Sequence, residues 1–245
     1  MTNMDASKKP WDNLISNEDR LVVEGGGYGK TRGLGKRPLV MVIDLQYNYV
    51  GDNQPILEQI DKWPSGGGQR AWKAIEKINI LIEKARDKEI PVLYTRNVQS
   101  NITFDSFSNK TDRDQSSYID GHQGTMIIKE IAPHKEDMVL DKAYPSAFYG
   151  TVLQSWLVKL GIDTLILTGG STCGCVRSTA IDAVSRNYNV AVVEQCVYDR
   201  IQVSHQASLF DLWMKFCDVI QLDNALNYIE TAVNPALPES ILEKG

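Results

Sequence analysis

The sequence predicts an α/β protein of three layers, in which a Rossmann-like parallel β-sheet of about six strands has helices on both faces. Short apolar runs rich in β-branched residues alternate along the chain with longer amphipathic stretches, a pattern typical of strands joined by crossover helices. The runs are almost continuously apolar, as expected of strands that are buried on both faces. A length of 245 residues with 42% apolar residues fits one such domain.

The predicted strands share a short length and a nearly unbroken series of aliphatic residues. They are residues 39–44, 90–95, 138–140, 164–168, 190–194 and 217–220. The predicted helices have apolar residues at spacings of three and four. They are residues 69–88, 150–160, 176–187 and 205–215. Each connection between neighbouring parallel strands is expected to be right-handed.

Residues 1–37 differ from the rest of the chain, because six of its 18 glycines fall between Gly25 and Gly35 and little apolar periodicity surrounds them. We expect an irregular N-terminal arm there, lying against its own domain or against a neighbouring subunit. One catalytic domain is expected over residues 38–245. The polar segment 99–129 is too long for a simple connection, and we expect a surface excursion with at most one helix.

Charge and hydropathy limit the classes of partner. The chain has 26 Lys and Arg against 31 Asp and Glu, a net charge of −5, which argues against a nucleic-acid binder. No window reaches the 18 continuous apolar residues that a membrane span needs, and the first residues lack the apolar stretch of a secretory signal. We therefore expect a cytoplasmic protein, with a small-molecule substrate and with neither nucleic acid nor membrane as partner.

The four cysteines all lie in the last third of the chain. They are Cys173, Cys175, Cys196 and Cys217. A chain of this size does not need disulfides to be stable, so reduced thiols are expected. At least one of them is a candidate for chemistry.

Reactive side chains follow three of the predicted strands. Asp44 closes the first strand, Lys142 follows the third, and the loop GGSTCGC leaves the fourth and enters a helix near Cys175. In a parallel sheet the carboxyl ends of the strands lie at one edge, where ligands bind. We expect these three residues to meet there.

Each of these residues has a second interpretation. Cys175 at a helix N-terminus favours a thiolate nucleophile, but a free cysteine can also pack as a small apolar residue. Asp44 after a buried strand must be paired or protonated, which suits a general base, although it could instead cap the next turn. Lys142 beside Asp141 could be an ordinary solvated pair.

Two other motifs are set aside. The segment EGGGYGKT resembles a Walker A loop but has Glu24 where a glycine is required. Gly33, Gly35 and Pro38 also prevent the helix that such a loop must open. Cys173-Gly174-Cys175 lacks the C-x-x-C spacing, and no second cysteine pair completes a zinc site. We expect Cys173 to be a bystander that lines the pocket.

The stretch TGGSTCGCVRSTAIDAVSRNY, with VIDLQ upstream and KAYPSAFYGT between them, resembles the isochorismatase-like cysteine hydrolases. Within them it is most similar to the N-carbamoylsarcosine amidase and maleamate amidohydrolase branch. The resemblance covers about residues 37–220. Its most specific parts are T-x-G-C-V-R-x-[ST]-A around Cys175 and K-x-Y-P-S-A-F at Lys142.

This resemblance implies a catalytic triad of Asp44, Lys142 and Cys175. It also implies an oxyanion hole made by the backbone amides of Ser171 and Cys175, with a non-proline cis peptide between Gly170 and Ser171 that turns one N–H toward the site. Arg200 matches a position that holds the substrate carboxylate in the carbamoylsarcosine branch, a role that suits a guanidinium. The alternative for Arg200 is a surface ion pair with Asp199.

The resemblance also bears on cofactors and assembly. Related nicotinamidases hold a metal with an Asp-x-His motif and further histidines, whereas this chain has Asp44-Leu45-Gln46 and, as its histidines, His122, His134 and His205. We therefore expect neither a metal nor another cofactor. The family implies a homodimer or homotetramer, and Arg177 is expected to make a structural or subunit contact.

The activity implied by this resemblance is hydrolysis of a linear C–N bond in a small ureido compound that carries a carboxylate, such as N-carbamoylsarcosine. The reaction would pass through a thioester, or carbamoyl-enzyme, and release ammonia. Hydrolysis of maleamate-like or other small primary amides is the alternative within the same chemistry. A binding module that has kept the fold without the reaction is the alternative from another class.

Overall fold

The computed structural model describes residues 9–100, 110–111, 114–232 and 234. Its centre is a six-stranded sheet in the order β3-β2-β1-β4-β5-β6, in which every neighbouring pair is parallel. The strands are β1 (Pro38–Ile43), β2 (Val92–Asn97), β3 (Met138–Lys142), β4 (Thr164–Gly170), β5 (Asn189–Tyr198) and β6 (Asp218–Ile220). The predicted fold class and the predicted strands are confirmed.

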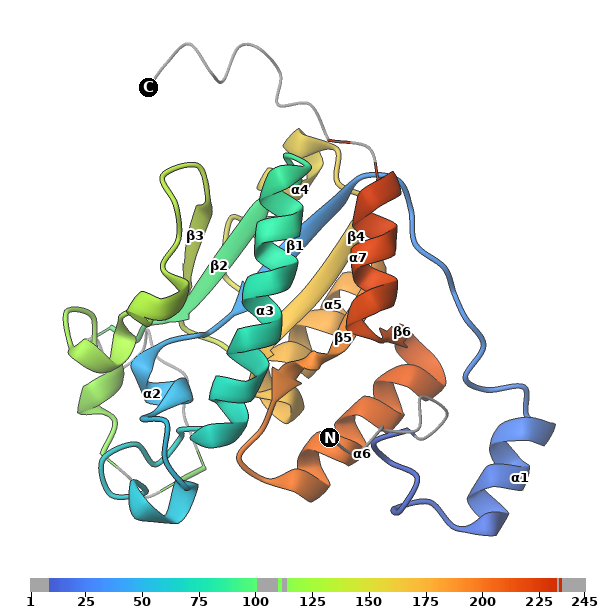
Figure 1. Ribbon diagram of the computed structural model, residues 1–245, viewed down its shortest axis with the longest axis horizontal. Coiled ribbons are helices and arrows are strands. Elements are labelled where there is room, and N and C mark those ends of the chain that lie inside the picture. The colour runs from blue at the N-terminus through green and yellow to red at the C-terminus, as the bar shows by residue number, and fades with distance from the viewer. Residues whose placement is uncertain (1–8, 101–109, 112–113, 233, 235–245) are drawn as a thin grey trace.

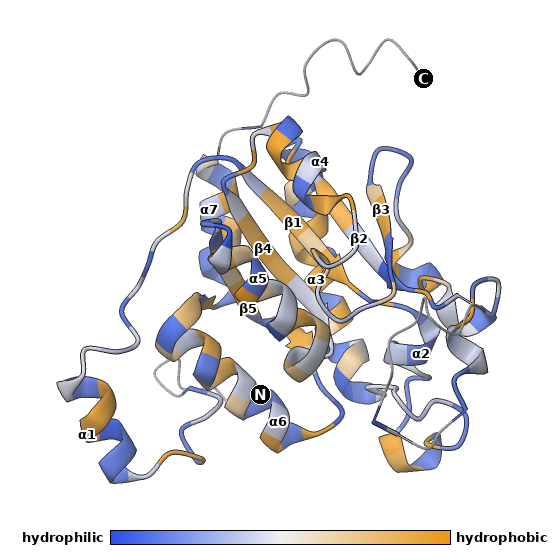
Figure 2. Cartoon of the chain, turned by 180° about the vertical axis from the view of Figure 1, so that it is seen from behind, coloured by the Kyte–Doolittle hydropathy of each residue, from blue (hydrophilic) through white to orange (hydrophobic). Residues whose placement is uncertain are grey.

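Helices cover both faces of this sheet. Helices α3 (Gln69–Asp87) and α7 (Leu222–Thr231) lie on the face that is toward the viewer in Figure 1. The opposite face, which is toward the viewer in Figure 2, carries α4 (Leu153–Leu160), α5 (Arg177–Ser185) and α6 (Gln202–Asp211). Each layer buries its own hydrophobic core against the sheet, which is why β1 and β4 are buried at every position.

Several predicted bounds differ from the structure. The helix predicted over 176–187 opens with a π-helical turn, Thr172–Val176, and the one predicted over 205–215 starts at Gln202 and ends in another, Leu212–Phe216. Strand β5 runs on to Tyr198, which pairs with Gly170 of β4 after a shift in register between Leu167 and Gly169. Helix α7 was not predicted. The extended β5 carries the residues after Tyr198 to the carboxyl edge of the sheet.

The N-terminal arm was predicted to be irregular, but part of it is helical. It contains a helix, α1 (Asn17–Gly25), which begins with a capping box between Ser16 and Asp19. The arm packs against its own domain through Trp11, which is 1% exposed and lies beside Phe210 and Trp213. No residue of α1 itself is buried, and Figure 1 shows this helix standing away from the sheet.

Short helical segments connect the main elements at the carboxyl edge. They are α2 (Tyr47–Val50) and the 3-10 turns Ile56–Glu58, Ser116–Tyr118, Gln123–Thr125 and Lys129–Ile131. Ser116–Tyr118 and Gln123–Thr125 belong to the excursion predicted over 99–129, and Lys129–Ile131 begins at its last residue. Residues 101–109 and 112–113 of the excursion lie outside the described part. Isolated bridges join Gln46 to Ile127 and Gln99 to Ile119. Within the described part, no helix has the length and hydropathy needed to cross a membrane.

Candidate active site

The strand order reverses between β1 and β4, which is where an open parallel sheet forms a crevice at its carboxyl edge. Asp44 follows β1, Lys142 ends β3, and Cys175 lies in the π-helical turn that follows β4. All three residues are buried, with relative exposures of 0%, 3% and 6%. The sheet thus brings the three predicted residues together on one side of its edge.

Asp44 and Lys142 form an ion pair with both side chains fully buried. Lys142 Nζ lies 2.8 Å from Asp44 Oδ2 and also donates to the carbonyl of Tyr144 at 3.1 Å. Asp44 has a φ of 50°, a left-handed conformation that Asp tolerates better than most residues. The Thr95 hydroxyl donates to Asp44 Oδ1 at 2.5 Å, and the Asp44 amide donates to Thr95 Oγ at 3.1 Å. The carboxylate is therefore fixed from two sides.

Charges in this cluster decide which group holds a proton. Burial lowers the pKa of Lys142, but the neighbouring charge of Asp44 and the hydrogen bond to it oppose this effect, and the pKa of Lys142 is raised above its usual value. A raised pKa keeps the ammonium protonated at neutral pH. The Asp44–Lys142 pair is then a carboxylate beside an ammonium, with no net charge.

The thiol of Cys175 interacts with both members of this pair. Burial and the charge of Asp44 together raise the pKa of Cys175 to about 12, although Lys142 acts in the opposite direction. The pKa is thus raised, whereas the position at a helix N-terminus predicts a lowered pKa and a thiolate, so that prediction is wrong. Lys142 cannot lower the pKa enough because its charge is already balanced by Asp44. The resting state is a thiol next to a carboxylate.

The raised pKa has a spectroscopic consequence. A group with a raised pKa stays protonated to higher pH, so Cys175 should form no thiolate between pH 6 and 9.5. We expect the absorbance at 240 nm of the wild type minus that of Cys175→Ala to stay flat over this range. Cys196 and Cys217, whose pKa values burial raises to about 12, provide matched alanine controls. A step in this absorbance difference near pH 7 would instead show that Cys175 forms a thiolate there and that its pKa is not raised.

Two glycines let the backbone reach Cys175 from β4. Gly169 has a φ of 98°, and a Cβ there would lie 2.1 Å from the carbonyl oxygen of Ile43 on β1. At Gly170 a Cβ would meet the ring of Tyr198 at 2.5 Å. The peptide bond between Gly170 and Ser171 is cis, at the position that the family resemblance implies. Side chains are thus excluded on both sides of the chain just before the turn.

The turn that carries Cys175 is held by residues at and after the end of β5. Asp199, which is 1% exposed, accepts a hydrogen bond from the Cys173 amide at 2.9 Å. The Thr172 hydroxyl donates to the Tyr198 carbonyl and lies 2.9 Å from Nδ1 of His205. Since the hydroxyl proton is used for Tyr198, His205 donates from Nδ1. Burial lowers the pKa of His205, which favours this neutral ring.

Arg200 lies at the same edge with its side chain 24% exposed. Its Nε donates to the carbonyl of Ser65 at 3.0 Å, and its Nη1 lies 3.9 Å from Asp199 Oδ1. The predicted alternative, a pair with Asp199, is therefore present, but only at the limit of an ion pair. Among the described residues, neither terminal nitrogen makes a hydrogen bond. Both remain able to bind an anion.

Two residues of this region were missed by the sequence analysis. Thr95 is the last residue of the strand predicted over 90–95, although β2 itself runs on to Asn97. The rule applied to Asp44, that polar residues at the carboxyl ends of strands gather at one edge, therefore also singles out Thr95. Tyr49 on α2 is half-buried, and burial raises its pKa well above the usual value. The charges of Cys175 and Asp44 raise it further while Arg200 opposes them. Tyr49 therefore lies among the triad and Arg200.

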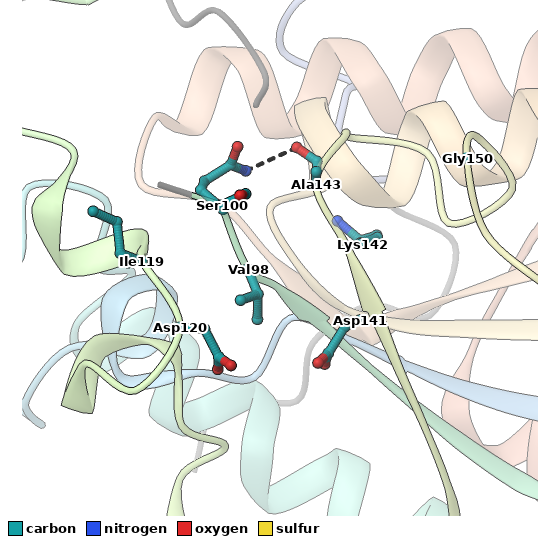
Figure 3. Close-up of a pocket in the computed structure, with 9 residues that line it drawn as sticks. Val98, Ser100, Ile119, Asp120, Asp141, Lys142, Ala143 and Gly150 are labelled. Carbon is teal, nitrogen blue, oxygen red and sulfur yellow. Dashed lines mark hydrogen bonds between the residues drawn. The ribbon is translucent and has the colours of Figure 1, made fainter. Parts of the chain in front are cut away.

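A surface hollow of about 470 Å³ lies beside the end of β3 (Figure 3). Lys142 is the one triad residue that lines it, and the carboxylates of Asp120 and Asp141 face it. Asp141 makes a two-pronged ion pair with Arg96. Asp44 and Cys175 do not line the hollow, so it reaches the three buried residues only at Lys142.

Gln46, two residues after Asp44, holds the backbone of two neighbouring segments. Gln46 is fully buried, and its amide binds the backbone of Asn97 through both N–H and C=O and also the carbonyl of Thr125. In the described part of the chain, no group of three or more His, Cys, Asp or Glu residues could hold a metal ion. The expectation of a reaction without metal stays a prediction.

Comparison with known proteins places this geometry in a family. Residues 38–224 match the Isochorismatase domain. The chain is 32% identical over 219 residues to the N-carbamoylsarcosine amidase of an Arthrobacter species, covering 87% of this chain and 77% of that protein. It is 29% identical over 206 residues to the maleamate amidohydrolase of Pseudomonas putida, covering 83% and 92%.

Solved structures agree with the sequence comparison. The N-carbamoylsarcosine amidase of Thermoplasma acidophilum superposes with a TM-score of 0.59 at 27% identity, over 76% of this chain and 97% of that one. An isochorismatase family protein from Desulfovibrio vulgaris, at 24% identity, shares the fold with a TM-score of 0.69 over 80% and 99%. The predicted family is confirmed: this chain belongs to the isochorismatase family of hydrolases.

Proposed function

We propose that this protein is a cysteine-dependent amidohydrolase that cleaves the linear C–N bond of a small carboxylate-bearing ureido compound, similar to N-carbamoylsarcosine. The observation that carries the proposal is the buried contact of 2.8 Å between Lys142 and Asp44, next to the thiol of Cys175. A nucleophile, a base and a cation in one buried cluster suit acyl transfer. The similarity to an N-carbamoylsarcosine amidase supports the substrate class.

The first half of the reaction forms a thioester. Asp44 accepts the thiol proton as the Cys175 sulfur attacks the carbonyl carbon, and Lys142 balances the negative charge that moves between sulfur and carboxylate. The tetrahedral intermediate then collapses. The proton held by Asp44 passes to the departing nitrogen, ammonia leaves, and the acyl group stays on sulfur.

The negative oxygen of the tetrahedral intermediate needs donors. We assign this role to the backbone amides of Ser171 and Cys175, which belong to the loop and turn after β4. A preorganised donor of this kind contributes about 3 kcal/mol to transition-state stabilisation. Asp199 and Thr172 support this role because they fix the backbone of the turn from outside.

The second half of the reaction releases the acid. A water molecule transfers a proton to Asp44 and attacks the thioester carbon. Collapse of the second tetrahedral intermediate expels the Cys175 sulfur, which regains its proton from Asp44. When the acyl group is a carbamoyl derivative, the product is a carbamic acid, which decays to carbon dioxide and an amine.

Two further parts of the proposal concern substrate choice and setting. Maleamate-like amides are the second candidate, favoured by the similarity to a maleamate amidohydrolase along 92% of its length. Both substrate types carry a carboxylate that Arg200 can bind with its two terminal nitrogens, neither of which makes a hydrogen bond within the described part of the chain. The free cysteines suit a reducing cytoplasm. Exposed Leu21 and Val22 on α1 suit a subunit contact in a homodimer or homotetramer.

Ammonia release from a panel of substrates tests this function. The panel pairs N-carbamoylsarcosine with N,N-dimethylurea, and maleamate with acrylamide, so that each acid has a neutral counterpart. We expect the wild type to prefer one or both acids. Arg200→Ala should raise KM for the acids by about tenfold or more with little change in kcat, because a charge-assisted hydrogen-bonded contact is lost. No ammonia from any compound, or an unchanged KM for Arg200→Ala, would contradict the proposal.

A further inference from the structure

Arg200 is held in place by contacts that leave its terminal nitrogens uncommitted. Its Nε donates to the Ser65 carbonyl at 3.0 Å, and its own carbonyl accepts from Nη1 of Arg70 at 2.8 Å. A guanidinium is planar, so fixing Nε and the side-chain stem sets the direction of the two remaining nitrogens. The position of the Ser65 carbonyl therefore decides where Arg200 points.

Ser65 lies in the segment between α2 and α3, next to three consecutive glycines, Gly66, Gly67 and Gly68. Such a segment has large conformational freedom unless something fixes it. The Tyr118 hydroxyl donates to the Ser65 hydroxyl at 2.6 Å, and both residues are buried, with exposures of 4% and 1%. This contact fixes the residue whose carbonyl holds Arg200.

Tyr118 belongs to the excursion after Gln99, to which the sequence assigned no role. Its neighbours Ile119 and Asp120 line the outer hollow (Figure 3). Tyr118 does not line that hollow. Its ring instead meets the ring of Tyr49 edge to face, with centroids 5.8 Å apart. The same side chain therefore contacts a residue of the candidate site and the residue that holds Arg200.

We propose that Tyr118 and Ser65 are positioning residues for Arg200, and that through them the excursion sets the selectivity of the enzyme for carboxylate-bearing substrates. This inference rests on the proposed function, because it requires Arg200 to bind the substrate carboxylate. The chain of contacts runs from the Tyr118 hydroxyl to the Ser65 hydroxyl and from the Ser65 carbonyl to Arg200 Nε. Neither positioning residue takes part in the chemistry at Cys175.

The test compares Tyr118→Phe, Ser65→Ala and the double variant with the wild type on an acid and its neutral counterpart. Each single variant should raise KM for the acid by about three- to tenfold, which is the range for one lost hydrogen bond, with kcat within twofold. KM for the neutral compound should not change. Where the neutral compound is not hydrolysed, its Ki as a competitive inhibitor replaces KM. The double variant should be no worse than either single one, because the two hydroxyls form one contact.

Matched controls separate positioning from a general loss of structure. Tyr228→Phe removes a hydroxyl that donates to the Gly35 carbonyl in the arm. This variant should change neither the KM for the acid nor the KM for the neutral compound. Ser65→Thr keeps a hydroxyl acceptor and should restore the KM that Ser65→Ala impairs. The inference is overturned if Tyr118→Phe leaves the KM for the acid unchanged, or if it lowers kcat equally for both compounds. If Arg200→Ala also fails to raise the KM for the acid, the proposed anion subsite itself is wrong.

Discussion

Replacing Cys175 with alanine is expected to lower the rate of ammonia release by about 10⁴-fold or more, because removing a nucleophile removes the covalent route altogether. What remains is the binding of substrate near an oxyanion hole with no attacking sulfur. Cys175 is 6% exposed, and its replacement deletes one sulfur atom from the edge of a core that is otherwise unchanged. The variant should therefore unfold in urea at nearly the wild-type concentration.

Cys217→Ala is the matched control for this experiment. Cys217 is also buried, at 4% exposure, and burial raises its pKa to about 12 as well, but it lies directly before β6, away from Asp44 and Lys142. We expect full activity from it. Mass spectrometry of wild type mixed briefly with substrate should show an added acyl group that Cys175→Ala lacks. Ammonia release from Cys175→Ala at the wild-type rate would contradict a covalent mechanism through Cys175.

The sheet and the location of the triad follow from local sequence patterns. The apolar runs predict buried strands because a strand covered on both faces has no polar positions. Asp44, Lys142 and Cys175 each come just after such a run, and a parallel sheet brings these points to one edge. The burial of the Asp44–Lys142 pair could not be predicted, since it depends on a contact between residues 98 positions apart. Thr95, which is 51 positions from Asp44, is a similar case.

The protonation state of Cys175 is where local reasoning was wrong. The sequence places a cysteine at a helix N-terminus and predicts a lowered pKa from that position alone. The structure adds burial and the nearby carboxylate of Asp44, which together have the larger effect. These are tertiary features, and a one-dimensional pattern does not contain them. The consequence for the proposed mechanism is that Asp44 must remove the proton during attack.

The substrate-binding side was even less accessible from the sequence. Arg200 was singled out by a family resemblance. Ser65, whose carbonyl binds Arg200, lies 135 residues from it in the chain, and Tyr118 lies 53 residues from Ser65. Both belong to segments without periodicity. Helix α1 shows the opposite situation, because its capping box between Ser16 and Asp19 is a local signal that was present but was outweighed by the nearby glycines.

Asp44→Asn is expected to have the second large effect, on activity and on stability together. The amide cannot accept the thiol proton, so ammonia release should fall by about 10³-fold. The substitution also leaves the buried ammonium of Lys142 without the charge of Asp44, which opposes the lowering of its pKa by burial. Breaking one partner of a buried pair costs about 3–5 kcal/mol in the free energy of unfolding. Urea denaturation at pH 7 measures this loss.

The double variant Asp44→Asn with Lys142→Met separates the two effects. It replaces the buried ammonium with an apolar side chain of similar length, and exchanging a whole buried pair is often neutral for stability. We expect the free energy of unfolding to recover to within about 1 kcal/mol of the wild type, while ammonia release stays as low as in Asp44→Asn. Recovery of stability without recovery of activity means that Asp44 is required for proton transfer and not only for folding. Recovery of both would show that the pair has only a structural role and that the base lies elsewhere.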